Sequence, residues 1–228
     1  MTKYLLIGGR SNSFEGKSKI YESFNKYSKT NKLLYIPYAN LNYEQGYKNF
    51  LSQAPSNLEV TLLSYDYLEN IEKLETKFIE NEIWFFAGGS ANTLMNTIYD
   101  NKINEIIYKY KDDKVIAGIS AGAIMISSFG FGDKDVFIEN NNYYNFKMVH
   151  GLKLIPYVVC PHYQKNGIEI FDEEVKKYDL DGICLEDDTS LWILQNVFDI
   201  IKDTSKNSVY LIDKNENFKL IPLYERKE

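Results

Sequence analysis

A serine between two glycines stands where one hydrophobic run gives way to another, in the sequence GISAG at residues 118–122. This G-x-S-x-G pattern is typical of a nucleophile elbow, a sharp strand-to-helix turn whose neighbouring residues must be small because the backbone is crowded. Ser120 is therefore a candidate nucleophile, and the N–H of Ala121 is a candidate donor to an oxyanion. The alternative is a small-residue turn that serves packing alone.

A glycine pair follows a second apolar run, in the sequence IWFFAGG at residues 83–89. Glycines at the carboxyl end of a strand let backbone N–H groups approach a ligand without side chains in the way. We expect Gly88 or Gly89 to donate the second hydrogen bond to the oxyanion. The alternatives are a phosphate-binding turn or a tight turn, although the spacing matches neither the dinucleotide nor the Walker pattern.

A nucleophilic serine needs a base, and the chain has two histidines, His150 and His162. His162 follows the apolar run of the sequence VVCPH, which predicts that it lies at the same sheet edge as Ser120. His150 precedes the next predicted strand and is expected at the opposite end. His162 is the favoured base, and the alternative for either residue is a surface histidine.

The imidazole must in turn be oriented by a carboxylate, which also stabilises the imidazolium. Three acids, Glu186, Asp187 and Asp188, follow the apolar run at 182–185. Glu186 comes first after this predicted strand and is the favoured partner. Asp187 is the next choice, with Asp133 and Asp135 of a polar and aromatic segment as rivals. Acidic clusters are more often solvated, but the position after a buried strand favours a role in the site.

The remaining pattern predicts an α/β fold. Short apolar runs, each hydrophobic at nearly every position, alternate with segments of helical length, which is typical of a parallel sheet covered on both faces. The runs are 4–7, 33–37, 60–64, 83–87 and 115–118, and the helical segments are 18–27, 43–54, 67–79 and 92–109. Ligand sites of such sheets lie at the carboxyl ends of the strands. Beyond a loop or hairpin at 129–146, we expect the same sheet to resume at 154–160 and 182–185, with further edge strands at 191–194, 209–212 and 219–222.

Composition limits the partners. The chain has 228 residues and a net charge of −6 without a basic excess, so a nucleic-acid surface is not expected. Cys160 and Cys184 predict two reduced, buried thiols rather than a disulfide framework. No segment approaches the ~18 apolar residues of a membrane span. We expect one cytoplasmic domain over residues 1–228, not bound to a membrane, as a monomer or small homo-oligomer.

Four segments together resemble peptidase family S51, which includes peptidase E (aspartyl dipeptidase) and cyanophycinase. They are FFAGGSANTL at 85–94, AGISAGAIM at 117–125, GLKLIPYVVCPHY at 151–163 and GICLEDDTSLWI at 182–193. The resemblance implies a three-layer, doubly wound, mostly parallel sheet of the class I glutamine amidotransferase-like (flavodoxin-like) type. It also implies a serine exopeptidase that hydrolyses short peptides without a metal or organic cofactor.

Carried over by motif, the resemblance implies Ser120 as nucleophile, His162 as base and Glu186 as third member of a triad, with Asp135 as a less favoured substitute. The order serine, histidine, acid differs from the serine, acid, histidine order of α/β-hydrolases. Arg10 and Asn92 are further candidates for substrate binding. Arg10 follows Gly8-Gly9 after the first predicted strand and could contact a carboxylate of the substrate, and the favoured alternative is a surface arginine that caps a loop. Two alternative functions are a hydrolase or transferase acting on a small amide or ester, and a non-catalytic relative that binds a ligand.

Overall fold

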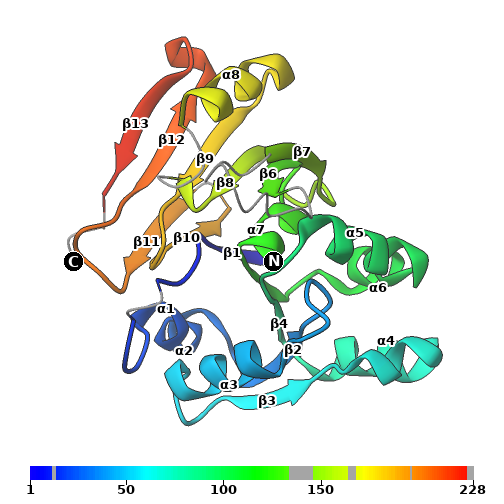
Figure 1. Ribbon diagram of the computed structural model, residues 1–228. Coiled ribbons are helices and arrows are strands. Elements are labelled where there is room, and N and C mark those ends of the chain that lie inside the picture. The colour runs from blue at the N-terminus through cyan, green and yellow to red at the C-terminus, as the bar shows by residue number, and fades with distance from the viewer. Residues whose placement is uncertain (12–13, 134–145, 164–167, 196, 225–228) are drawn as a thin grey trace.

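Two β-sheets and the helices between and around them form the protein (Figure 1). The computed structural model describes residues 1–11, 14–133, 146–163, 168–195 and 197–224. The first sheet has the strand order β11-β10-β1-β5-β4-β2-β3. Five of its strands run parallel and match the five predicted apolar runs: β1 (Lys3–Ile7), β2 (Lys32–Ile36), β3 (Glu59–Leu62), β4 (Ile83–Phe86) and β5 (Val115–Ile119).

Helices cover both faces of this parallel region, because consecutive residues of each strand project to opposite faces. In β4, Trp84 packs with the helices of one face and Phe85 with those of the other. The Phe85 side carries α1 (Lys19–Glu22), α2 (Phe24–Tyr27) and α3 (Glu44–Gln53). The Trp84 side carries the 3₁₀ helix η1 (Tyr65–Glu69), α4 (Ile71–Glu80), α5 (Ala91–Asp100) and α6 (Ile103–Tyr110).

The later strands differ from the prediction, since the runs at 154–160 and 182–185 do not extend the first sheet. They give β8 (Tyr157–Pro161) and β9 (Asp181–Leu185) of a second sheet with the order β13-β12-β9-β8-β6-β7. Its other strands are β6 (Phe129–Asp133), β7 (Phe146–His150), β12 (Val209–Asp213) and β13 (Lys219–Leu223). The 3₁₀ helix η3 (Lys214–Glu216) connects β12 to β13. The expected single, mostly parallel sheet is therefore replaced by two mixed sheets.

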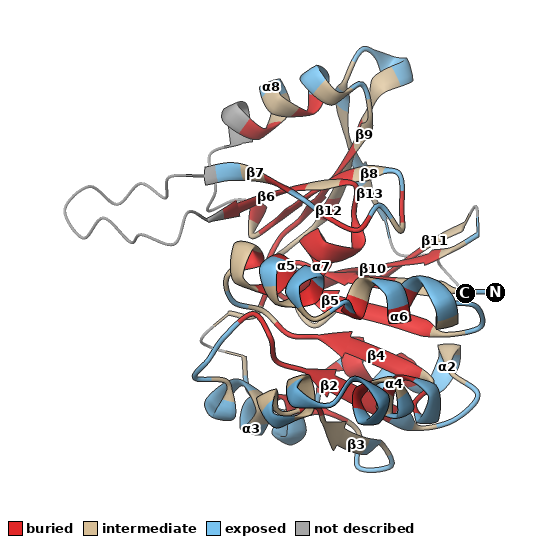
Figure 2. Ribbon diagram, turned by 90° about the vertical axis from the view of Figure 1, so that its right-hand side faces the viewer, coloured by how far each residue is buried: buried red, intermediate tan, exposed pale blue. Residues whose placement is uncertain are grey.

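The chain crosses back between the sheets directly after β9. Residues 186–188 lead from β9 into β10 (Thr189–Leu194), which pairs antiparallel with β1 and with β11 (Val197–Lys202) of the first sheet. The short helix α7 (Ala121–Ile126) is buried at every residue and contacts strands of both sheets. Helix α8 (Ile168–Tyr178) covers the outer side of the second sheet (Figure 2). None of the helices in the described ranges is long and apolar enough to cross a membrane.

The two cysteines lie opposite each other on neighbouring parallel strands, Cys160 in β8 and Cys184 in β9. Both side chains are fully buried and neither forms a disulfide bond. Burial raises the pKa of the Cys184 thiol well above its usual value, since a thiolate there would lose its hydration.

We predict that the native protein does not react with the thiol reagent DTNB at pH 8, because a buried, protonated thiol is a poor nucleophile. Unfolding in guanidinium chloride should release two reactive thiols per chain. The absorbance of released thionitrobenzoate measures both. Rapid reaction of either thiol in the native state would contradict the buried placement.

Candidate active site

The serine of the GISAG segment occupies the turn between β5 and α7. Ser120 has φ 52° and ψ −111°, a backbone conformation that non-glycine residues rarely adopt and that is strained. Its N–H donates to the carbonyl of Ile7 at the end of β1, at 3.0 Å. Its own carbonyl accepts hydrogen bonds from the N–H groups of Ala123 and Ile124. The turn is thus held by the neighbouring strand on one side and by the helix on the other.

Close packing explains the two glycines around Ser120. A Cβ atom at Gly118 would overlap the backbone of Gly122, and a Cβ at Gly122 would overlap the carbonyl of Phe86. Any larger residue would push α7 away from β4 and β5. The G-x-S-x-G spacing is therefore required by the elbow geometry.

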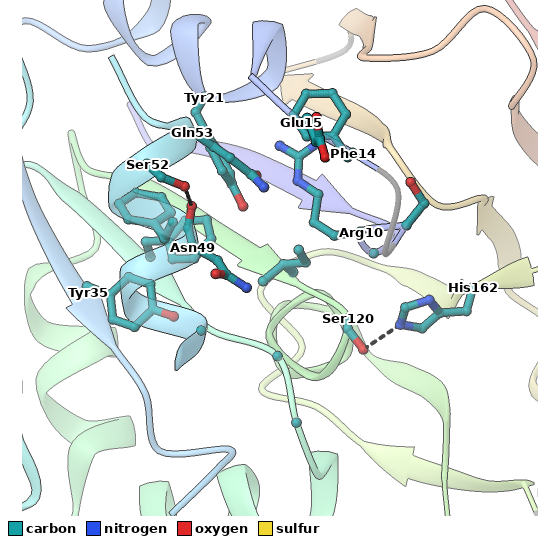
Figure 3. A pocket seen from close by; sticks show the side chains of 18 of the residues that line it. Arg10, Phe14, Glu15, Tyr21, Tyr35, Asn49, Ser52, Gln53, Ser120 and His162 are labelled. Atoms are coloured by element: carbon teal, nitrogen blue, oxygen red, sulfur yellow. Dashed lines mark hydrogen bonds between the residues drawn. The ribbon is translucent and has the colours of Figure 1, made fainter. Parts of the chain in front are cut away.

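His162 meets the serine from the other sheet. It follows β8 directly, and its Nε2 lies 3.0 Å from the Oγ of Ser120 (Figure 3). The two residues come from the ends of strands in different sheets, rather than from one sheet edge as the sequence suggested. The other histidine, His150, is exposed at the end of β7, where its ring packs edge-on against Phe129.

Asp187, and not Glu186, lies against the histidine. The Nδ1 of His162 is 2.5 Å from Oδ1 of Asp187, whose side chain is 8% exposed. The carboxylate of Glu186 is turned away and accepts hydrogen bonds from the N–H of Ser208 at 2.8 Å and from the hydroxyl of Tyr210 at 3.4 Å. Glu186 thus bonds to residues at the start of β12 in the second sheet, whereas Asp187 bonds to His162.

Asp133 and Asp135 were the two other acids that the sequence offered as partners of the histidine. Asp135 and the side chain of Asp133 lie outside the described residues.

Ser120, His162 and Asp187 form a hydroxyl–imidazole–carboxylate line. Such a line can remove the hydroxyl proton and stabilise the resulting imidazolium.

A glycine pair after β1, to which the sequence pattern had assigned no role in the site, makes room for this line. A Cβ atom on Gly9 would overlap Cε1 of His162 and Oδ1 of Asp187, and one on Gly8 would overlap the carbonyl oxygen of Glu186. The N–H of Asp188 donates to the carbonyl of Gly9 at 2.9 Å. The signal was present, because Gly8-Gly9 follows a buried strand just as Gly88-Gly89 does.

The expected oxyanion donors lie beside the serine. A Cβ on Gly88 would be 3.3 Å from the Cβ of Ser120, so the backbone at Gly88 adjoins the hydroxyl. Gly89 has φ 145°, a conformation that favours glycine, and packs against the carbonyl of Ala39. Ala121 is the first residue of α7, where backbone N–H groups have no partner within the helix.

A cavity of about 690 Å³ opens from Ser120 and His162 toward α1 and α3 (Figure 3). Its wall includes residues 9–11 and 14–16 after β1, Tyr21, Tyr35, Phe85, and several residues of α3. Asn92, expected to bind substrate, is in the first turn of α5 and is not among the described residues that line it.

Arg10 lines the cavity, but its guanidinium is already bound within the protein. Nη1 forms an ion pair with Asp203 and lies 3.5 Å from Oδ1 of Asp188, and Nη2 donates to the hydroxyl of Ser18. The guanidinium carbon also lies 4.6 Å from the centre of the Tyr21 ring. The structure thus ties Arg10 to neighbouring side chains rather than leaving it as the expected carboxylate contact.

Comparisons with known proteins bear on the family and the fold of the chain. The model of peptidase family S51 matches residues 4–201. A peptidase from an acI-B1 Actinobacterium has a TM-score of 0.62 at 16% identity, over 99% of this chain and 95% of that one. A protein assigned as peptidase E from Listeria monocytogenes EGD-e has a TM-score of 0.59 at 15% identity, over 90% of this chain and 100% of that one. At these identities the two structures establish a shared fold. No curated protein has a matching sequence.

We predict that Gly9→Ala slows labelling of Ser120 by a fluorophosphonate probe by about 100-fold, because displacing a catalytic group by about 1 Å costs on that order. The added methyl group must push His162 away from Asp187. Mass spectrometry of the labelled peptide over time gives the rate.

The matched control for this variant is Gly46→Ala. It adds the same methyl group at the far side of the cavity, where the nearest atom is the hydroxyl of Tyr35 at 3.6 Å. This variant should be labelled at nearly the wild-type rate. Equal labelling of the Gly9 variant and the wild type would show that the glycine is not needed to position His162 against Asp187.

Proposed function

The chain belongs to peptidase family S51 and is a serine peptidase, and from this premise we propose that it is an exopeptidase of short peptides whose catalytic residues are Ser120, His162 and Asp187. One observation carries the assignment of residues. The Oγ of Ser120, the imidazole of His162 and the carboxylate of Asp187 form a continuous line with distances of 3.0 Å and 2.5 Å. The proposal replaces Glu186 by Asp187 as the acid of the triad.

The line supports acyl transfer by the following steps. The Oγ of Ser120 attacks the scissile carbonyl carbon while Nε2 of His162 accepts the hydroxyl proton. Asp187 accepts a hydrogen bond from Nδ1–H, which fixes the tautomer that leaves Nε2 free to act as base. His162 then protonates the leaving amine. Water, deprotonated by the same imidazole, hydrolyses the acyl-enzyme.

Backbone N–H groups would stabilise the oxyanion of each tetrahedral intermediate. Ala121 at the start of α7 is one proposed donor, and Gly88 or Gly89 is the other. Removing one such donor from an enzyme costs roughly 3–4 kcal/mol of transition-state stabilisation. The strained turn at Ser120 serves this arrangement, since it directs Oγ and the next N–H to the same place.

The size of the cavity supports a short substrate. About 690 Å³ falls within the range of roughly 300–1,000 Å³ typical of small-molecule sites. Residues after β1 and residues of α3 both contribute to its wall. We also place the protein in the cytoplasm, because two free thiols on adjacent strands are typical of a reducing compartment.

We predict that Ser120→Ala reduces dipeptide hydrolysis by about 10⁶-fold, the magnitude seen when the nucleophile of such a triad is removed. The substitution deletes only Oγ, so the thermal unfolding temperature should stay close to that of the wild type. Amine release from a dipeptide library, followed with ninhydrin, measures the rate. Retained hydrolysis in the variant would refute the role of Ser120.

Two adjacent isosteric substitutions separate the candidate acids. Asp187→Asn should lower kcat by about 10⁴-fold, because an amide favours the wrong imidazole tautomer. Glu186→Gln should leave kcat close to the wild-type value, since an amide oxygen can still accept from Ser208. Steady-state kinetics on the best dipeptide give both values. The reverse order of effects would return the triad to Glu186.

A further inference from the structure

The cavity beside Ser120 is lined mainly by uncharged side chains. Asn49 and Gln53 lie one turn apart on α3 and turn their amide groups toward the space (Figure 3). Aromatic side chains complete the wall, among them Tyr21 and Tyr35. Burial raises the pKa of both phenols, so both remain neutral hydrogen-bonding groups at physiological pH.

Arg10 is the only lysine or arginine among the described residues that line this cavity. Its side chain is 15% exposed, while its partners Asp188 and Asp203 are 4% and 1% exposed. One guanidinium thus faces two buried carboxylates, and the three groups together carry a net negative charge. The Nε atom is buried as well, so an incoming carboxylate cannot reach it.

A second ionisable side chain of the wall, that of Glu15, does not supply the missing positive charge. Glu15 is an exposed acid, which would repel an acidic ligand and, being in solvent, offers no buried counter-charge to a basic one. Lys17, two residues further on, is turned to the end of α3, where its Nζ donates to the carbonyl of Ala54 at 2.5 Å.

From this charge balance we propose that the cavity selects peptides whose side chain next to the scissile bond is uncharged and hydrogen-bonding, and that it rejects aspartate and glutamate. The proposal rests on the proposed peptidase function of the same site. The amide groups of Asn49 and Gln53 are the specificity-determining contacts. Asn49 is oriented by Gln45, whose Nε2 donates to its Oδ1 at 2.7 Å.

The physical basis is the cost of burying an ion without a partner. A carboxylate that enters the cavity loses part of its hydration and finds no free cation among the described residues of the wall, whereas a carboxamide of the same shape exchanges water for the amides of α3. A site whose polar groups match one of two isosteres can discriminate strongly against the other. We expect at least about tenfold discrimination here.

Matched dipeptides test the proposal, because asparagine and aspartate differ in charge but hardly in shape. Asn-Leu should be hydrolysed with a kcat/KM at least tenfold above that of Asp-Leu, or Leu-Asn above Leu-Asp, depending on which side chain enters the cavity. Equal or faster hydrolysis of the acidic member at both positions would overturn the proposal. A lysine dipeptide that surpasses the asparagine dipeptide would also overturn it.

Two substitutions at one position test the cause. Gln53→Arg places a free cation in the cavity and should raise the ratio of kcat/KM for the aspartyl over the asparaginyl substrate by at least tenfold. Gln53→Met, of similar length and no charge, should lower kcat/KM for the asparaginyl substrate without raising kcat/KM for the aspartyl substrate, because it removes the amide and adds no cation. Gln53 is only partly buried, so both variants are expected to fold, which thermal unfolding checks. An unchanged ratio in folded Gln53→Arg refutes the assignment of the cavity.

Binding to the Ser120→Ala protein separates this inference from the proposed function. Isothermal titration with the same four dipeptides reports the cavity even if no peptide is hydrolysed. Preferential binding of the asparagine dipeptide without hydrolysis by the wild type would support the cavity assignment and refute the peptidase proposal. Equal binding of both members, or binding of neither, would refute the cavity assignment.

Discussion

The join between the two sheets is the constraint on which the site depends. Ser120 stands at the end of a strand in the first sheet, His162 at the end of a strand in the second, and Asp187 in the three-residue link from β9 to β10. The line of hydrogen bonds through these residues exists only while the sheets keep their relative position. β10 secures that position, since it leaves the second sheet through this link and pairs with β1 of the first.

The close approach at this join is possible because of glycine. At Gly8 and Gly9 the backbone of β1 touches the acidic link and the His162–Asp187 pair, and at Gly118 and Gly122 α7 touches the first sheet. Each contact removes the space that a Cβ atom would need. The end of β1 therefore serves the whole site, because the carbonyl of Ile7 also accepts the hydrogen bond from the N–H of Ser120.

Charge in the site is arranged in two separate ways. The acid beside His162 faces an imidazole that gains charge during the proposed reaction, so its negative charge assists chemistry. The acids beside Arg10 instead neutralise its guanidinium, and Asp203 also accepts hydrogen bonds from N–H groups at the start of α1. The arginine thereby fastens α1 and the segment after β1 to the end of β11. A cavity built in this way leaves recognition to amides and phenols.

Local sequence patterns were enough to predict most of the elements and most of the candidate residues. The five parallel strands of the first sheet, the serine elbow, the glycine pair at 88–89 and the choice of His162 over His150 followed from apolar runs and the residues that end them. Residues 134–145 of the segment at 129–146, with Asp135 among them, lie outside the described residues. The place of β8 and β9 in a second sheet became clear in the folded chain alone, because an apolar run does not specify which strand it pairs with. The folded chain thus fixes the pairing. It also decided between Glu186 and Asp187, since adjacent acids differ only in the direction of their side chains, and that direction depends on how the link between the sheets is held.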